Sequence, residues 1–278
     1  MTASPHVAQF SLGGARAFVT GGSGFLGAAS CRALAAAGAL VAVGGRDAAR
    51  AEAVAAQLRA FGGDGFAIVG DLREPAVVEA ARRTIEDRWG GLDILVNAAG
   101  VHLPAALVSA ETGGVESASL DAFREVVETN ATSTLAVIQA VLPLLRAPGR
   151  LATASVVNFG SMSADRALTR ALGYGVSKAA VTNLTRWLAC ELAAGERPVR
   201  VNAIAPGFIL TPANHALMLD GDRLTARGQT VVGRTPMGRF GEPDEIGGAV
   251  AFLCTPAASF ITGEVLAADG GFSAWSGV

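Results

Sequence analysis

The residues whose chemistry stands out are a tyrosine and a lysine four positions apart, in the stretch YGVSK at 174–178. Tyr174 and Lys178 are the only tyrosine and the only lysine, and arginine fills the other 21 basic positions. On a helix these two side chains share one face, so the ammonium can lower the phenol pKa and make a proton donor and acceptor. A solvated surface pair is the alternative, but a guanidinium could not replace this compact ammonium.

A glycine-rich stretch, TGGSGFLG at 20–27, follows the first expected strand and opens an expected helix. Its G-x-G-x-x-G spacing lets the backbone approach a pyrophosphate at the positive end of a helix, although a ligand-free turn can have the same composition. Asp71, after the third expected strand, could accept from an adenine amino group or cap the next helix. The expected contacts in the loop are Gly21, Gly22, Ser23, Gly24, Phe25, Leu26 and Gly27.

The end of the second expected strand, VAVGGRD, indicates which dinucleotide is bound. An acid there would bind the adenosine ribose diol, whereas Gly45 followed by Arg46 leaves room for a 2′-phosphate and directs a charge towards it. A solvated Arg46 is the alternative, and Asp47 could cap the next helix. We therefore expect NADP(H) rather than NAD(H).

The elements that position these residues alternate along the chain. Short apolar runs (RAFVT, LVAVG, FAIVG, LDILVN, SVVNF, VRVNAIA and EVLAAD) alternate with helical stretches at 25–38, 47–60, 74–89, 120–146, 174–194 and 243–254. This rhythm predicts a three-layer, doubly wound α/β fold with a parallel sheet. We expect a loose N-terminal arm at 1–14 and one domain at 15–278. Segments 101–119 and 208–242 follow strand ends, where such sheets place ligands.

Composition excludes several classes of protein. A chain of 278 residues, 51% hydrophobic, can bury one large core. Net charge is −2 and the arginines are scattered, which argues against a nucleic-acid or membrane-surface partner and favours a small molecule. The three cysteines are far apart, so we expect reduced thiols in a cytoplasmic protein and no metal site. No apolar run reaches a membrane-spanning length.

Taken together, several motifs resemble the short-chain dehydrogenase/reductase family across residues 15–271. They are YGVSK with Ser161 thirteen positions upstream, NAAG at 97–100, Asn130 in VVETNATSTL, and APGFILT at 205–211. The resemblance implies a Rossmann-type seven-stranded sheet and hydride transfer between nicotinamide and a carbonyl or alcohol. One departure is the loop spacing, TGxxGxxG instead of TGxxxGxG, which leaves the local path of the phosphate loop open.

The resemblance also implies roles for individual residues. Tyr174 would be the general acid and base, Ser161 would hydrogen-bond the substrate oxygen, and Lys178 would bind the nicotinamide ribose and depress the tyrosine pKa. Asn130 would hold a water in the proton relay, and Asn97 would position the adenosine side of the coenzyme. The remaining expected coenzyme contacts are Leu72, Ala98, Ala99, Gly100, Pro206, Gly207, Ile209 and Thr211. A homotetramer, or a homodimer, is implied as well, with Leu135, Val137, Leu184, Trp187 and Leu188 either at subunit contacts or in the core.

The last third of the chain, together with SMSADRALTRALGY, looks like a subgroup named D-mannonate oxidoreductases. A sugar acid needs a cation for its carboxylate and polar groups for its hydroxyls. The candidates are His102, Arg166, Arg170, Asn214 and His215, each of which could instead be a solvated loop residue. An apolar ketone or a 3-oxoacyl thioester is the second hypothesis, with Leu103, Leu107, Leu217 and Met218 lining the site. A non-catalytic nucleotide-binding protein is the third.

Overall fold

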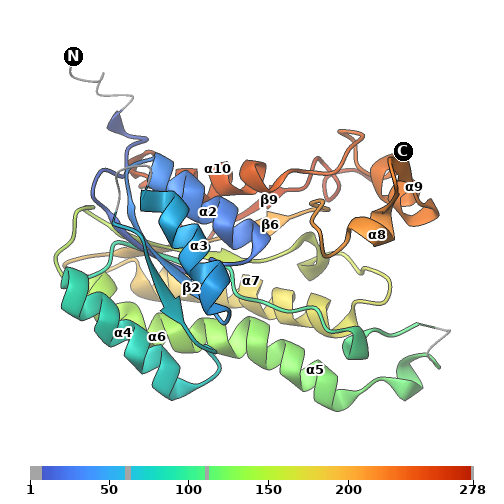
Figure 1. Ribbon diagram of the computed structural model, residues 1–278, viewed down its shortest axis with the longest axis horizontal. Helices are drawn as coiled ribbons and strands as arrows, with labels where there is room; N and C mark the ends of the chain where they lie inside the picture. Colours follow the sequence, from blue (N-terminus) through green and yellow to red (C-terminus); the bar gives the residue numbers. More distant parts are fainter. Residues whose placement is uncertain (1–7, 60–63, 110–112, 277–278) are drawn as a thin grey trace.

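Seven apolar segments form one parallel sheet at the centre of the molecule (Figure 1). The structure is a computed structural model that describes residues 8–59, 64–109 and 113–276. Every expected strand is present, and the strand order β3-β2-β1-β4-β5-β6-β9 confirms the doubly wound fold. The strands are β1 (Arg16–Thr20), β2 (Leu40–Gly45), β3 (Phe66–Val69), β4 (Ile94–Asn97), β5 (Ala154–Phe159), β6 (Val199–Pro206) and β9 (Val265–Ala268).

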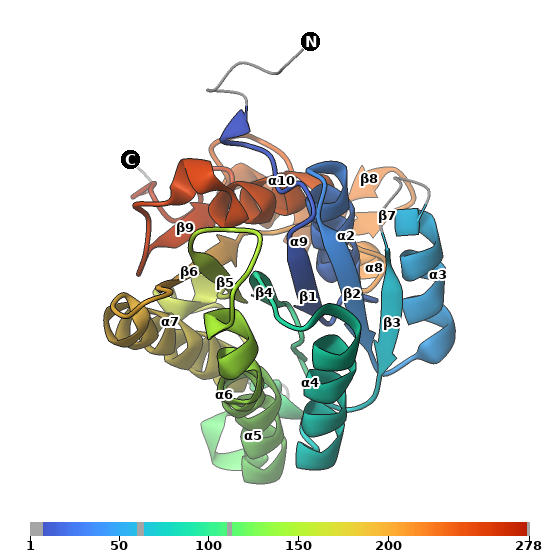
Figure 2. The ribbon, with the colours of Figure 1, turned by 90° about the vertical axis from the view of Figure 1, so that its left-hand side faces the viewer.

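Helices cover both faces of this sheet, which accounts for the continuous apolar character of its strands. Figure 2 shows α2, α3 and α10 on one face and α4, α5, α6 and α7 on the other. Every residue of β5 and β6 is buried as a result. The helices are α2 (Phe25–Ala36), α3 (Ala48–Arg59), α4 (Pro75–Trp89), α5 (Leu120–Val127), α6 (Ser133–Arg146), α7 (Leu172–Leu192) and α10 (Pro243–Cys254).

The order of the strands reverses between β1 and β4, which are direct neighbours in the sheet. Thr20 pairs with Asn97 at the carboxyl end of these two strands, and both side chains are buried. Open α/β sheets bind their ligands at such a reversal, outside the carboxyl ends of the strands. The glycine-rich loop after β1 and the NAAG segment after β4 therefore meet at one crevice.

The expected continuous helix at 120–146 is not continuous. A π-helical turn at Glu128–Thr132 separates α5 from α6. The hydrophobic period is nearly the same on both sides of such a turn, so the sequence pattern predicted one helix instead of two. Single π-turns inside α-helices often occur at functional sites, and this one contains Asn130.

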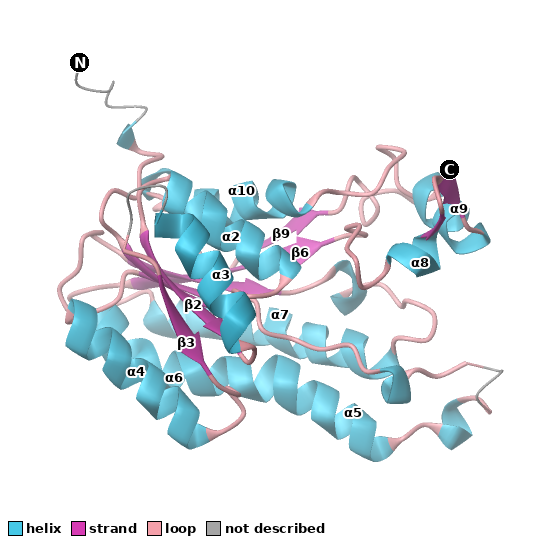
Figure 3. Cartoon of the chain, in the orientation of Figure 1, coloured by secondary structure: helices cyan, strands magenta, loops and turns pink. Residues whose placement is uncertain are grey.

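The segment at 208–242 folds apart from the main sheet. It contains α8 (His215–Met218), the short antiparallel strands β7 (Leu219–Asp220) and β8 (Arg223–Leu224), and α9 (Ala226–Gly233). Figure 3 shows α8 and α9 at the same end of the molecule as the C-terminal residues. The segment thus forms a small separate layer near the carboxyl ends of the strands.

Part of the expected loose arm packs onto this core. Among its described residues, Leu12 is fully buried and Phe10 stacks on Phe252 of α10 with ring centroids 6.5 Å apart.

The three cysteines differ in exposure to solvent, because Cys31 and Cys254 are buried whereas Cys190 is exposed on α7. Within the described ranges, no helix combines the length and the apolar character needed to cross a membrane.

A buried carboxylate, Asp93, ties together the amino ends of the central strands. Its oxygens accept from Arg16 Nε at 2.9 Å and from Arg197 Nη2 at 2.6 Å, and three backbone N–H groups also donate to them. Burial by itself would raise the pKa of Asp93, but Arg16 and these backbone donors hold it below its usual value. The side chain of Asp93 is completely inaccessible to solvent, so this cluster is part of the core at the end of the sheet opposite the crevice.

Candidate active site

The glycine-rich loop runs directly into the amino end of α2, where the first helical N–H groups have no side-chain cap and no acidic neighbour. Two of its glycines are required by the local packing. Gly21 has φ 64°, and a Cβ there would lie 2.7 Å from Ala99. A Cβ at Gly27 would lie 2.1 Å from the carbonyl oxygen of Gly21. The loop is thus held tightly against NAAG and α2, and the uncapped N–H groups at the start of α2 are donors of the kind that bind a pyrophosphate.

A cavity of about 420 Å³ lies beside this loop and extends over the carboxyl ends of β1 to β4. Nine residues that the sequence predicted as coenzyme contacts line it: Gly21, Ser23, Gly24, Arg46, Asp71, Leu72, Ala98, Ala99 and Gly100. The backbone and charges around this cavity fit a dinucleotide, because uncapped N–H groups face one part of it and a guanidinium faces another. Gly22, Phe25, Leu26 and Gly27, which the sequence also predicted as contacts, lie outside the lining.

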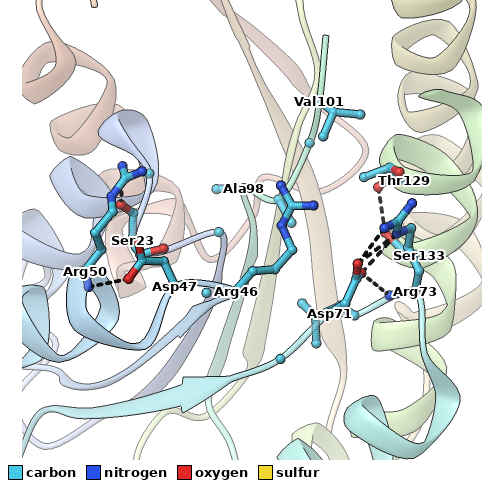
Figure 4. Close-up of a pocket in the computed structure, with 17 residues that line it drawn as sticks. Ser23, Arg46, Asp47, Arg50, Asp71, Arg73, Ala98, Val101, Thr129 and Ser133 are labelled. Atoms are coloured by element: carbon cyan, nitrogen blue, oxygen red, sulfur yellow. Dashed lines mark hydrogen bonds and ion pairs between the residues drawn. The ribbon is translucent and has the colours of Figure 1, made fainter. Parts of the chain in front are cut away.

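Three arginines line the cavity, of which the sequence analysis identified only Arg46. Figure 4 shows Arg46 between Asp47 and Arg50 on one side and Asp71 and Arg73 on the other. Arg50 Nη2 donates to the carbonyl oxygen of Ser23 at 3.0 Å, and Arg73 forms an ion pair with Asp71 at 2.6 Å. Among the described residues, the Arg46 guanidinium has no hydrogen-bond or ion-pair partner, so it is available to an anion.

Asp71 and Asp47 each hold a local turn as well as lining the cavity. Two Asp71 oxygens accept from the Arg73 side chain and one from its backbone N–H, and these bonds hold the pKa of Asp71 at about 2. Much of the acceptor capacity of Asp71 is therefore used within the protein. Asp47 accepts from the backbone N–H of Arg50 at 3.0 Å and caps α3, as the sequence suggested.

Position 45 has no room for the acid that would bind a ribose diol. A Cβ at Gly45 would lie 2.2 Å from Ser23 Oγ and 2.9 Å from Ser23 Cβ. A side chain there would require Ser23, which belongs to the phosphate loop, to move. Gly45 is thus coupled to the loop conformation.

Asn97 does not lie where the sequence analysis expected it. Its side chain is buried at the end of β4, and Nδ2 donates to Asn158 Oδ1 at 3.0 Å. Asn158 in turn donates to Thr185 on α7 at 2.9 Å. Asn97 therefore lies under the cavity floor, between β4, β5 and α7, instead of facing the adenosine side.

The four predicted catalytic residues lie close together at the carboxyl ends of β4 and β5. Ser161 Oγ is hydrogen-bonded to the Tyr174 hydroxyl and also accepts from Ser163 Oγ at 2.9 Å. Lys178 Nζ donates to the carbonyl oxygen of Phe159 at 2.6 Å. A Cβ at Gly100 would lie 3.2 Å from Asn130 Oδ1 and 3.6 Å from Lys178 Nζ, so this glycine lets NAAG approach both groups.

The π-turn aims Asn130 at the loop after β4. Its Nδ2 donates to the carbonyl oxygen of Val101 at 3.0 Å and to Ser177 Oγ at 2.9 Å, while Oδ1 accepts from Val101 N at 2.7 Å. Both amide hydrogens are therefore used. A relay water at this residue would have to donate to Oδ1 or to its main-chain carbonyl.

Lys178 is a buried ammonium with an energetic cost. Burial lowers its pKa from 10.5 to about 8. Between these two values the unfolded chain binds more protons than the folded chain, so this contribution makes stability rise with pH across that window. Below about pH 8 the ligand-free protein carries the full penalty, on the order of 3 kcal/mol. A ligand oxygen that accepts from Nζ would recover part of it.

The expected lowering of the tyrosine pKa is wrong for the protein by itself. Burial raises the pKa of Tyr174 above its usual value, and the hydrogen bond from Ser161 only partly opposes this. Lys178 Nζ lies 5.6 Å from the centroid of the phenol ring and is bonded to Phe159, so its charge does not overcome the desolvation. Without a ligand, Tyr174 is therefore a protonated phenol.

The structure brings only some of the substrate candidates to this cluster. His102 packs edge to face on Tyr174 with ring centroids 5.4 Å apart, and burial, followed by Arg227 on α9, lowers its pKa. Asn214 is occupied in holding its own loop, through bonds with Thr211 N at 2.8 Å and Ile209 O at 2.9 Å. His215 is exposed on α8. Met218, a candidate to line a site for an apolar substrate, is buried, and its backbone carbonyl packs against Gly228 of α9.

A second cavity, of about 880 Å³, lies between the loop after Ser161, α9 and the C-terminal residues. Arg166 lines it, whereas Arg170 lines a different, more apolar hollow along α7. Phe208, next to Gly207 in the APGFILT stretch, also lines the second cavity. Gly207 itself packs on Asp269, where a Cβ would lie 2.6 Å away, and Ile209 is buried. Pro206 ends β6 and Thr211 lies in the loop that Asn214 holds.

Comparison with known proteins agrees with this geometry. A family model described as enoyl-(acyl carrier protein) reductase matches residues 23–273. The chain belongs to the short-chain dehydrogenase/reductase family. As a member of that family it is an NAD(P)-dependent oxidoreductase acting on an alcohol or a carbonyl.

Relatives of this short-chain dehydrogenase/reductase span its whole length. An uncharacterised oxidoreductase, UxuB of Bacillus subtilis, is 37% identical and covers 96% of this chain and 98% of its own. A structure described as a D-mannonate oxidoreductase from Haemophilus influenza with bound NAD has a TM-score of 0.88 at 32% identity, covering 98% and 100%. A gluconate 5-dehydrogenase from Burkholderia cenocepacia with NADP and tartrate has a TM-score of 0.86 at 30% identity, covering 97% and 99%.

The sequence analysis of this dehydrogenase/reductase missed four arginines that line the two cavities: Arg50, Arg73, Arg227 and Arg234. Arg50 and Arg73 each lie a few residues after a predicted coenzyme contact at a strand end, and that proximity was the available signal. Arg227 lies in a segment without strand or motif context. Only the folded position of α9 brings it to the site.

Proposed function

We propose that this protein interconverts a secondary alcohol and a ketone of a small polyhydroxy compound, a sugar acid such as D-mannonate or a polyol. The observation that carries the proposal is the Tyr174 hydroxyl, hydrogen-bonded to Ser161 and backed by the buried ammonium of Lys178. The relatives described as acting on sugar acids support the substrate class. Arginine side chains line both cavities, which is a second reason to favour a substrate with polar or anionic groups.

The protein's own residues would carry the proton and orient the substrate. A bound nicotinamide dinucleotide would supply or accept the hydride. In the reducing direction, the Tyr174 hydroxyl donates its proton to the carbonyl oxygen, while Ser161 Oγ holds that oxygen in place. A phenol that is protonated in the ligand-free protein is suited to this direction. Lys178 retains two ammonium hydrogens beyond its bond to Phe159, and these would hold a ribose hydroxyl.

A substrate comparison tests this function. Because the proposed site presents hydroxyl, ammonium and guanidinium groups, D-mannonate should be oxidised with NADP or NAD at a kcat/KM at least about tenfold above that for a secondary alcohol of equal length. The measurement is coenzyme absorbance at 340 nm. The second candidate substrate is a 3-oxoacyl thioester, because a relative that is 37% identical is described as a 3-oxoacyl-[acyl-carrier-protein] reductase. Turnover of a 3-oxoacyl thioester without turnover of any sugar acid or polyol would reject the proposal in its favour.

We also propose that NADP(H) is preferred. The support is the lack of an acid at Gly45, where a side chain does not fit, together with the available guanidinium of Arg46 and the nearby Arg50 and Arg73. Replacing Arg46 with Gln should raise the KM for NADPH by about 10- to 100-fold, since a charge-assisted bond to phosphate contributes about 1.5–3 kcal/mol. The KM for NADH should change by less than about twofold. An equal loss for both coenzymes would exclude 2′-phosphate recognition by Arg46.

Self-assembly through α5 and α7 is proposed on the basis of their exposed apolar side chains. Leu120, Leu172, Val176 and Trp187 are all exposed, whereas Val137 and Leu188 are in the core. A homotetramer or a homodimer would cover this surface. Sedimentation velocity would distinguish them, and a monomer at micromolar concentration would contradict both.

A further inference from the structure

The larger cavity, between the loop after Ser161, α9 and the C-terminal residues, has several positively charged side chains in its lining. Three arginines line it, Arg166, Arg227 and Arg234, and no carboxylate does so among the described residues. Arg166 Nη2 donates to the carbonyl oxygen of Ser273 at 2.5 Å and so fixes the C-terminal wall. Arg227 and Arg234 have no side-chain hydrogen bond or ion pair with the part of the chain that the structure describes. Two guanidiniums in one cavity are therefore available to a ligand.

Arg227 carries most of the argument, because it is partly withdrawn from solvent. Its Nε is buried and has no hydrogen-bond partner within the described residues. A buried donor without a partner costs about 1–3 kcal/mol, and more when it is charged. A carboxylate can satisfy such a guanidinium with two parallel bonds, which is the geometry that arginine provides and lysine does not.

One wall of the cavity is formed by the loop that follows Ser161. The positive charge of Arg227 contributes to lowering the pKa of His102, and His102 packs edge to face on the Tyr174 ring. Phe208, in the loop after β6, forms another part of the wall. In Figure 1, α9 lies at the end of the molecule where the loops after the strands emerge. A ligand with its hydroxyl at Tyr174 could thus extend its other end towards Arg227.

We propose that Arg227, assisted by Arg234, binds the carboxylate of the substrate in this cavity and selects sugar acids over the corresponding uncharged polyols. The inference rests on the proposed function and narrows it to an acid. The volume of this cavity, about 880 Å³, accommodates a six-carbon chain together with water. Arg227 would then determine specificity and binding, with the proton chemistry left to Tyr174.

The test compares two ligands that differ at one carbon. D-mannonate carries a carboxylate where D-mannitol carries a hydroxymethyl group, and with reduced coenzyme neither can react. Calorimetry on the protein saturated with reduced coenzyme should give a Kd for D-mannonate at least about tenfold below that for D-mannitol. Arg227→Gln should abolish most of this difference by weakening D-mannonate alone, and Arg227→Lys should restore only part of it.

Arg223→Gln provides the matched control. Arg223 is exposed on β8 of the same segment, lies outside the cavity lining, and its replacement changes the net charge equally. This variant should keep the wild-type preference. Equal Kd values for the two ligands in the wild type, or an unchanged preference in Arg227→Gln, would overturn the proposal.

Binding and turnover separate the two hypotheses. A carboxylate preference that depends on Arg227, without oxidation of any aldonate or polyol, would retain the anion site and reject the proposed substrate class. Oxidation of D-mannonate with no selective effect of Arg227→Gln would retain the function and reject the site.

Discussion

Replacing Tyr174 with Phe is expected to lower kcat by about 10²- to 10⁴-fold, the contribution typical of a positioned proton donor. The substitution removes one oxygen, which is hydrogen-bonded to Ser161, and keeps the ring against which His102 packs. Coenzyme affinity should stay within about twofold, because the bonds of Lys178 and Asn130 do not involve that oxygen. Steady-state rates with D-mannonate and fluorescence titration with NADPH measure the two quantities.

Comparing the change in kcat with the change in coenzyme affinity distinguishes a role of Tyr174 in proton transfer from a role in packing. If coenzyme affinity fell together with kcat, Tyr174 would be a packing residue of the pocket. A rate near that of the wild type would show that another group transfers the proton, and the proposed mechanism would be abandoned.

Replacing Asp93 with Asn is expected to have the largest effect on stability, a loss of about 3–5 kcal/mol in the free energy of unfolding. Removing one member of a buried charge cluster leaves the others uncompensated. Arg16 and Arg197 would both lose their carboxylate, and Arg197 already has a buried Nε without a partner in the described residues. Denaturation by urea at fixed protein concentration measures the change through the transition midpoint.

An exposed ion pair supplies the control for this substitution. Asp121 pairs with Arg124 at 2.9 Å, and both side chains are largely in solvent. Asp121→Asn should change the free energy of unfolding by less than about 0.5 kcal/mol. If Asp93→Asn were equally mild, the amino ends of the strands would be held mainly by apolar packing. The fraction of Asp93→Asn protein that remains folded should have the KM values of the wild type, since the Asp93 cluster is remote from the crevice.

The sequence was sufficient to predict the sheet because each strand is an apolar run long enough to be buried on both faces. Helical spacing was sufficient to bring Tyr174 and Lys178 together, whereas Ser161 and Asn130 were assigned to the same site through the resemblance to the short-chain dehydrogenase/reductase family. The π-turn escaped prediction because a one-residue insertion barely changes the hydrophobic period.

Charge and burial at single side chains were less predictable. Helical spacing placed Tyr174 beside Lys178, but whether burial or the ammonium dominates the phenol pKa depends on the depth of the site and on the bond from Lys178 to Phe159. Arg227 reaches the centre through the tertiary placement of α9, to which no local pattern refers. Asn214 was one candidate for a substrate contact, yet an amide beside a tight turn can bond to its own backbone instead.

The extra residue in the π-turn at Glu128–Thr132 sets how far α5 is rotated about the helix axis relative to α6. Deleting one residue from the π-turn would leave a regular α-helix and would rotate α5 by about 100° relative to α6. Asn130 would then point away from Val101, while the apolar face of α6 would need to stay against the sheet. The apolar face of α6 and the side chain of Asn130 therefore require different rotations about the helix axis. The extra residue in the π-turn allows both.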